Sequence, residues 1–327
     1  MFSKLFSELK STVTTTPPQP TPRTRNKAPR PIQTKYLSSP VPIPPDFLTG
    51  APPADARPIT VTPVNWASTP LPEYAGLYAT VLDHVLSLSE CQTLLRLAES
   101  SVPAPGEDGS ELRHSATDPW GPALVNAGGG FEVLDQEYRN SDRIVWDCQE
   151  VVDRIWARCL EGGGEEFRRR FEEIGAGEKD ITGLRMEGFR EAKWAFHRVN
   201  DRMRFLRYGK GGFFKPHCDA PYVDMSDPKR NIRTMFTIHL YLNDSKAEVE
   251  GAELVGGATS FFSNDEKRKL DVDPKAGRVL IFQHRRLVHS GDDVRAGTKY
   301  SMRTDIMYEF LHKEDEEDKK DNEDAEE

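Results

Sequence analysis

The 327-residue sequence lacks several patterns that would assign it to a common class of protein. Its four cysteines form no CxxC pair and no dense framework, which argues against a zinc finger or a disulfide scaffold and favours reduced thiols. It has no run of eighteen or more apolar residues, so it predicts no membrane span. Its net charge is −9, whereas a general nucleic-acid binder needs an excess of Lys and Arg, so no nucleic-acid partner is expected.

The two ends of the chain differ in composition from its middle. The start, MFSKLFSELKSTV, has a broken apolar run and no small-residue cleavage site, so we expect no signal peptide and a cytoplasmic or nuclear protein. Proline dominates much of residues 1–72, which we predict to be a Pro-rich, largely disordered lead-in. Residues 313–327 are strongly acidic and predict a disordered, solvated tail. The folded domain is therefore expected over residues 73–312.

The first part of this domain is predicted to be helical. Ser87 and Glu90 match a capping box, and apolar residues at Leu94, Leu95 and Leu97 follow it. A second helix is expected over residues 143–160, where apolar residues recur at helical spacing, with a stop at the three glycines of residues 162–164. We expect both helices to support the core and assign them no chemistry.

The pattern after Trp194 changes to strands. The runs MRFLRY, TMFTIHLYLN, ATSFF, RVLIFQH and KYSMRTDIMYEF are short, rich in β-branched and aromatic residues, and closed by turn residues. Many short strands after a helical start favour an α+β fold with a double-stranded β-helix, or jelly-roll, core buttressed by N-terminal helices. No repeat of fixed period is present, which disfavours propellers and solenoids. The catalytic core is expected over about residues 200–312.

The strongest candidate for a metal site is the pair His217 and Asp219. On a strand, residues i and i+2 point to the same side, so the imidazole and the carboxylate converge on one point. His289, at the end of a later strand, supplies a third donor, with His284 as its alternative five residues earlier. Two imidazoles and one carboxylate form the facial triad of iron(II) oxygenases, whose open positions accept a 2-oxo acid and oxygen. His239 is expected to be a hydrogen-bonded core histidine.

A 2-oxoglutarate site also needs a cation for the distal carboxylate of that cosubstrate. Lys299 lies ten residues after His289 at the start of a strand, which suits an inward-pointing ammonium group. Arg303, four residues further along, faces the same side of the strand and could serve instead. The sequence leaves both candidates open.

Five segments together resemble one enzyme family: RYGKGGFFKPHCD, the Thr and Tyr of RTMFTIHLYLND, GGATSFF, GRVLIFQHRRLVHSG and GTKY. They are similar to the catalytic domain of prolyl 4-hydroxylase-type iron(II)/2-oxoglutarate dioxygenases, over roughly residues 204–310. The resemblance implies His217, Asp219 and His289 as iron ligands and Lys299 as the 2-oxoglutarate anchor. It also implies Tyr208, Thr237 and Thr259 as residues lining the cosubstrate pocket. Phe214 departs from the family, which often has a hydroxylated aromatic residue there.

This resemblance implies an enzyme that uses Fe(II), 2-oxoglutarate and O2, with L-ascorbate as the reductant. The expected reaction hydroxylates an organic substrate, either a small molecule or a peptidyl residue such as proline, and converts 2-oxoglutarate to succinate. The alternative is a non-catalytic jelly-roll module that recruits partners through its Pro-rich segment. A cupin-type metal protein is disfavoured, because that class usually needs an HxH pair and a Glu ligand.

Overall fold

The computed structural model describes residues 30–50, 52–104, 113–115, 117–175, 177–183 and 192–311. Residues 1–29 of the predicted lead-in and the predicted acidic tail lie outside the described residues. Two long helices, α1 (Leu88–Ser100) and α2 (Gln149–Glu172), lie side by side against a body of strands. A short helix, α3 (Lys179–Thr182), and two 3-10 turns, η1 (Trp66–Ser68) and η2 (Pro72–Tyr74), complete the described helical segments.

Most described strands belong to two antiparallel sheets that face each other. The larger sheet contains, in spatial order, β2 (Thr60–Pro63), β3 (Ala79–Asp83), β18 (Val279–Gln283), β14 (Ile232–Tyr241), β21 (Lys299–Leu311), β11 (Arg202–Tyr208), β8 (Asp142–Asp147) and β4 (Gly121–Pro122). Three further strands extend it: β9 (Glu173–Gly175), β10 (Lys193–Val199) and β13 (Val223–Asp224). The smaller sheet has the order β17 (Lys269–Val272), β16 (Thr259–Phe262), β19 (His289–Gly291), β12 (Phe213–His217) and β7 (Arg139–Asn140).

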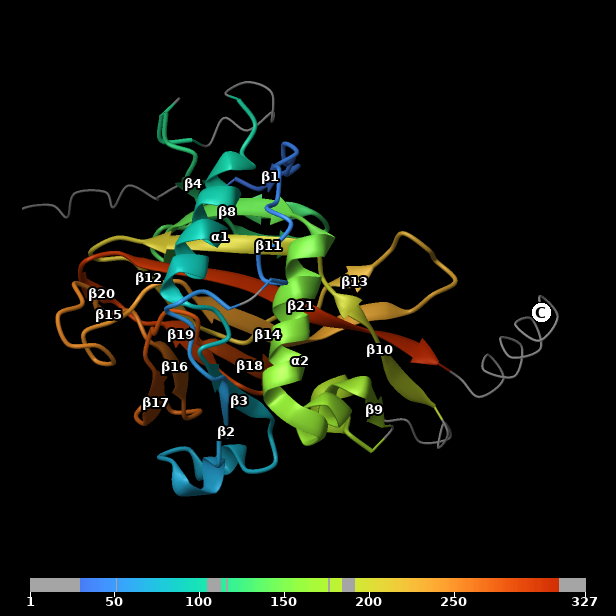
Figure 1. Cartoon of the computed structure of the whole chain (residues 1–327). Helices are drawn as coiled ribbons and strands as arrows, with labels where there is room; N and C mark the ends of the chain where they lie inside the picture. The colour runs from blue at the N-terminus through green and yellow to red at the C-terminus, as the bar shows by residue number, and fades with distance from the viewer. Residues whose placement is uncertain are drawn as a thin grey trace, which may run out of the picture.

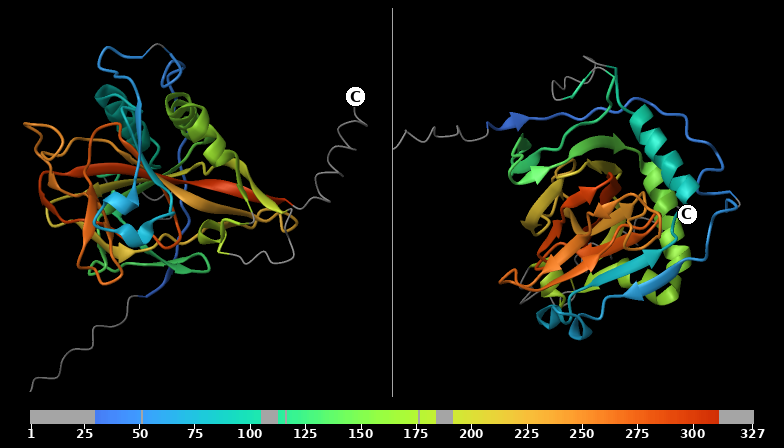
Figure 2. Two further views of the ribbon diagram at one scale, coloured as in Figure 1. Left: turned by 90° about the horizontal axis from the view of Figure 1, so that it is seen from below. Right: turned by 90° about the vertical axis from the view of Figure 1, so that its left-hand side faces the viewer.

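Two small sheets lie outside these layers. One has the order β1 (Ile32–Gln33), β6 (Phe131–Val133) and β5 (Val125–Gly128), and the other pairs β15 (Val255–Gly256) with β20 (Val294–Ala296). The two main sheets form the double-stranded β-helix, and α1 and α2 cover the outer face of the larger sheet (Figure 2). The predicted α+β class with a jelly-roll core is therefore confirmed. None of the helices in the described ranges is long and apolar enough to cross a membrane.

The two faces of the larger sheet follow from side-chain alternation along β14. Phe236, Ile238 and Leu240 belong to the core that includes the buried residues of α1 and α2. Thr237, His239 and Tyr241 alternate with them and face the other way, toward the smaller sheet. The side chains available for chemistry therefore lie between the two sheets, away from the helices.

The capping box predicted for α1 is confirmed. The Ser87 hydroxyl accepts a hydrogen bond from the Glu90 backbone N–H at 3.2 Å, and the Glu90 carboxylate accepts one from the Ser87 N–H at 2.8 Å. These two bonds satisfy backbone donors that the first turn of a helix leaves unpaired. Glu90 also pairs with Arg158 of α2 at 2.8 Å, so the cap joins the two helices.

The second helix begins later than its sequence pattern predicts. Residues 142–147 form β8, which pairs with β11, so Trp146 lies opposite Met203 in a sheet. The run is bulky and β-branched, and pairing with a neighbouring strand outweighs its helical spacing. The predicted stop at the glycines is confirmed: Gly164 has non-helical backbone angles, with a φ of +74°, and divides α2 at a kink into two helical parts.

The prediction of a largely disordered lead-in is wrong for its described part, residues 30–50 and 52–72. Phe47, Leu48, Trp66 and Leu71 are buried, and β2 pairs with β3. Figure 2 shows this segment, coloured blue, crossing the outer side of α1 and α2. The Arg154 guanidinium of α2 donates to the Phe47 carbonyl oxygen at 2.6 Å. Proline removes backbone donors, but side chains of the domain satisfy the acceptors that remain.

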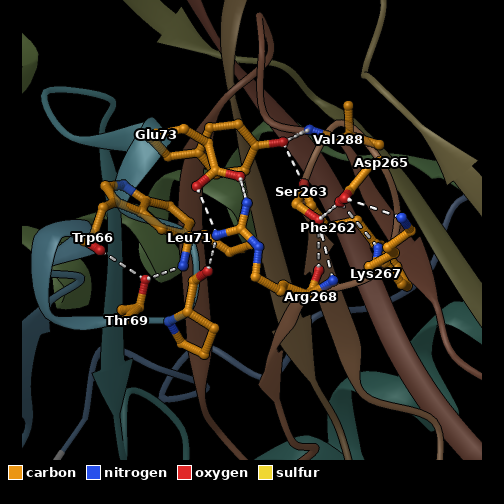
Figure 3. Close-up of polar contacts among 12 residues, drawn as sticks. Trp66, Thr69, Leu71, Glu73, Phe262, Ser263, Asp265, Lys267, Arg268 and Val288 are labelled. Carbon is orange, nitrogen blue, oxygen red and sulfur yellow. Dashed lines mark hydrogen bonds and ion pairs between the residues drawn. The ribbon is translucent and has the colours of Figure 1, made fainter.

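The end of this segment is fixed to the smaller sheet. Figure 3 shows Trp66, Leu71 and Glu73 beside the β16–β17 hairpin that carries Arg268. Arg268 pairs with Glu73 at 2.8 Å and donates to the Pro70 carbonyl oxygen at 2.5 Å. Trp66 is buried and donates from its indole nitrogen to the Leu77 carbonyl oxygen at 2.8 Å. Residues 52–72 are thus part of the folded body.

Candidate metal centre

Neighbouring strands of the smaller sheet bring the predicted metal ligands together. His217 ends β12 and His289 begins β19, and the two residues are direct partners in the pairing of these strands. Their ring centroids are 4.4 Å apart. Asp219 lies two residues after His217, and one donor atom from each of the three residues falls within 4.8 Å of the others. Strand pairing thus brings together His217 and His289, which lie 72 positions apart in the sequence.

Both imidazoles present the same nitrogen to this point. The Nδ1 atoms of His217 and His289 lie 2.8 Å and 3.1 Å from the carbonyl oxygens of Lys215 and Leu287. A carbonyl only accepts, so each Nδ1 carries the proton and each Nε2 has a free lone pair. The Nε2 atoms lie 3.6 Å and 3.7 Å from the two carboxylate oxygens of Asp219. Burial lowers the pKa of His289 to about 3, which keeps this donor neutral.

Asp219 is a buried carboxylate held from two sides. The Thr237 hydroxyl donates to its Oδ2 at 2.5 Å, and the Arg303 guanidinium lies 2.8 Å from its Oδ1. Burial alone would raise the pKa of Asp219, but the charge of Arg303 holds it well below its usual value. Two neutral imidazole nitrogens and one ionised carboxylate fit the donor set of a facial-triad iron(II) site.

Arg303 and His284, two alternatives from the sequence, are both engaged with Asp305. The Arg303 guanidinium lies 3.1 Å from Asp305 in addition to its contact with Asp219. His284 is buried, and its Nε2 lies 3.3 Å from Asp305, away from the ligand group. Arg204 pairs with the same carboxylate at 3.2 Å. Of the two histidine candidates, the structure therefore brings His289 to the centre.

Unlike Arg303, Lys299 is buried without a counter-ion among the described residues. It is 2% exposed, and its ammonium group forms no ion pair with any of the described carboxylates. Its Nζ lies 5.3 Å from the ring centre of Tyr208 and 5.4 Å from that of Tyr241. Burial lowers the pKa of Lys299 to about 7. A buried cation that lacks a partner is a site for an anionic group.

A cavity of about 50 Å³ joins Lys299 to the two histidines. Tyr208 and Thr259 line it as predicted, whereas Thr237 contacts Asp219 instead. The Thr259 hydroxyl accepts a hydrogen bond from Tyr241 at 2.7 Å. His239 also lines the cavity, and its buried Nε2 has no hydrogen-bond partner in the described part of the chain. The prediction of a hydrogen-bonded core histidine is therefore wrong for that nitrogen.

The sequence interpretation missed two basic residues that line the cavity, Arg139 and Arg204. Arg204 lies four residues before Tyr208 on β11, so the period of two along a strand would have placed it on the same face. Arg139 lies on β7, just before the segment interpreted as a helix, and no local pattern marks it.

Three solved prolyl hydroxylases are similar to this chain at low sequence identity. A solved viral collagen prolyl hydroxylase from Paramecium bursaria Chlorella virus-1 is 19% identical, with 71% of this chain and 97% of that chain covered and a TM-score of 0.37. A Pseudomonas putida prolyl-4-hydroxylase is 16% identical, with 74% and 99% covered and a TM-score of 0.39. A Trichoplax adhaerens prolyl hydroxylase, solved with a hypoxia inducible factor peptide, is 14% identical, with 71% and 83% covered and a TM-score of 0.38. Similarities this weak indicate no substrate.

A comparison with curated proteins found none that matches the chain. Residues 203–304 match the model of the 2OG-Fe(II) oxygenase superfamily. This range begins in β11 and ends in β21, so it contains the strands that carry the metal-ligand candidates and Lys299. The resemblance found in the sequence is thereby confirmed: over residues 203–304 the chain is similar to the 2OG-Fe(II) oxygenase superfamily.

Proposed function

We propose that the protein is an Fe(II)- and 2-oxoglutarate-dependent dioxygenase that hydroxylates an organic substrate and releases succinate. The observation that carries this proposal is the convergence of two imidazole nitrogens and one carboxylate beside a buried, unpaired lysine. Three protein donors leave the remaining positions of an octahedral metal open, as cosubstrate chemistry requires.

Each residue has a defined role in this proposal. His217, Asp219 and His289 would hold Fe(II), and Lys299 would pair with the distal carboxylate of 2-oxoglutarate, with Tyr208 and Thr259 beside it. Bound iron and 2-oxoglutarate supply the activation of O2. Between Lys299 and Arg303, the contacts support Lys299, because the Arg303 guanidinium already pairs with Asp219 and Asp305.

The chain itself contributes alignment and exclusion of water. The two backbone carbonyls that accept from the Nδ1 atoms fix the direction of both imidazoles. The Thr237 hydroxyl fixes the plane of the Asp219 carboxylate. The apolar side chains of Leu206 and Phe214 line part of the cavity beside these groups. Such pre-alignment lowers the reorganisation needed when the reaction occurs.

The test is the release of succinate by the purified full chain with Fe(II), 2-oxoglutarate and L-ascorbate under air. Candidate substrates come from two classes, prolyl peptides and small metabolites, and the expected result is faster release with members of one class. Asp219→Ala should remove turnover, and Asp265→Ala, at an exposed carboxylate of the β16–β17 hairpin, should not. Iron-loaded protein that binds 2-oxoglutarate in no condition would refute the proposal and favour the binding-module alternative.

A further inference from the structure

Arg139 is a second buried cation at the same cavity. It lies on β7, at the edge of the smaller sheet, and is 9% exposed. Its Nε donates to the Ser141 hydroxyl at 3.1 Å, and its guanidinium carbon lies 4.6 Å from the ring centre of Phe214. No carboxylate among the described residues forms an ion pair with it.

The electrostatic surroundings of Arg139 are unfavourable in the protein alone. Burial lowers the pKa of Arg139, and the charges of Arg143 and Arg303 act in the same direction. The Tyr208 hydroxyl favours the charged form of Arg139 but is not a carboxylate. An arginine nevertheless stays protonated in proteins, so this site holds a buried positive charge without a counter-ion.

The other three basic residues of the cavity wall have an anionic partner either in the structure or in the proposed function. Arg204 and Arg303 pair with the carboxylates behind them, Asp305 and Asp219. Lys299 takes one carboxylate of 2-oxoglutarate in the proposed function, and the other carboxylate belongs at the metal. These assignments leave Arg139 as the one cation of the wall without an anion.

We infer that Arg139 binds a carboxylate of the molecule that is hydroxylated, so that the substrate is a small carboxylic acid of the amino-acid type. This inference rests on the proposed function. A guanidinium matches a carboxylate with two parallel hydrogen bonds, whereas a neutral prolyl residue inside a peptide would leave the charge unpaired.

Arg139 is linked to the metal-ligand candidates through one aromatic side chain. Phe214, which contacts the Arg139 guanidinium, also lies against His217, with ring centroids 3.9 Å apart. One aromatic ring therefore separates the guanidinium from the metal-ligand candidate. A carboxylate held at Arg139 would bring carbon atoms a few bonds away next to the open metal positions.

The first experiment separates Arg139 from the cosubstrate site. Fe(II)-loaded full-length protein is titrated with 2-oxoglutarate without oxygen, and the visible charge-transfer band of the complex is recorded. Lys299→Ala should weaken 2-oxoglutarate binding by about 10- to 100-fold, and Arg139→Gln by less than about 3-fold. Equal weakening in the two variants would overturn the inference, because Arg139 would then belong to 2-oxoglutarate. Wild-type protein that fails to bind 2-oxoglutarate would refute the proposed function instead.

The second experiment compares acids with their neutral analogues. Each proteinogenic L-amino acid and its carboxamide is added to the Fe(II)–2-oxoglutarate complex, first without oxygen to detect a shift of the visible band, then with oxygen to measure succinate. At least one acid should bind and accelerate release, and its carboxamide should bind about 10- to 100-fold more weakly. Arg139→Gln should remove this preference for the acid, and Arg139→Lys should retain part of it. Arg268→Gln, remote from the cavity, serves as the matched control.

Two results would contradict the inference while leaving the proposed function in place. One is a carboxamide or a neutral prolyl peptide that binds as well as any acid. The other is an acid that binds equally well to wild type and to Arg139→Gln, because a purely structural arginine would change the melting temperature but not the choice between acid and amide. Failure of every acid of the panel to shift the band also overturns it.

Discussion

The buried ammonium of Lys299 makes 2-oxoglutarate binding depend on pH. Burial lowers the pKa of Lys299 to about 7, and Asp292 and Asp273 offset this effect only in part. The carboxylate of 2-oxoglutarate binds the protonated form, so the complex raises the lysine pKa again. Above pH 7 the free protein must therefore take up a proton in order to bind. The affinity should fall as the pH rises.

The size of the effect follows from that pKa. Between pH 7.0 and pH 8.5, the protonated fraction of a lysine with a pKa of about 7 falls from about one half to about 3%, which predicts an increase of about 15-fold in the apparent Kd. At pH 8 about 0.9 proton should be taken up for each 2-oxoglutarate bound. His289 does not contribute in this range, because burial lowers its pKa to about 3.

Anaerobic calorimetry in buffers of different ionisation enthalpy measures the affinity and the proton uptake together. Lys299→Arg is the control, because a guanidinium stays charged throughout this range and should show a Kd that changes little with pH. A wild-type Kd that is constant from pH 7.0 to pH 8.5, or an uptake near zero at pH 8, would show that Lys299 is not the anchor.

Three further predictions concern the residues around this site and the fold that carries it. Thr237→Val removes the donor to Asp219 and should weaken Fe(II) binding about 10-fold in a chelator competition, whereas unchanged affinity would show that the hydroxyl is dispensable. Arg303→Gln should weaken Fe(II) binding similarly but change 2-oxoglutarate affinity by less than about 3-fold; the opposite order would make Arg303 the anchor. Ser87→Ala should lower the free energy of unfolding by about 1 kcal/mol in urea, and no change would contradict the role of the cap.

Alternation along strands was enough to predict much of the centre from the sequence. His217 and Asp219 are two positions apart, which predicts that they point to the same side, and the structure brings them together as expected. The same rule could not decide between Lys299 and Arg303, which both face inward on β21. That choice depends on Asp305, which engages the guanidinium, and a contact of this kind is visible only in three dimensions.

Other sequence predictions were wrong for segments whose structure depends on contacts with residues far away in the sequence. Residues 142–147 have a helical spacing of apolar residues, but pairing with β11 makes them a strand. Arg139 was overlooked because its position at the cavity depends on the pairing of β7 with β12. The lead-in has the composition of a linker, and composition does not reveal that Phe47 and Trp66 find apolar surfaces to cover.

Because residues 30–50 cross α1 and α2, they limit how far the protein can be truncated from its N-terminal side. Composition alone suggests a domain boundary at residue 73. A fragment that starts there would lose β2, which pairs with β3. It would also lose the backbone carbonyl oxygens of Phe47 and Leu48, which accept hydrogen bonds from Arg154 and Arg158. Newly bared apolar surface on both helices would then meet water, a known cause of association between partly folded chains. The described part of the proline-rich stretch therefore belongs to the folded domain, and a shortened protein should retain it from Arg30 onward.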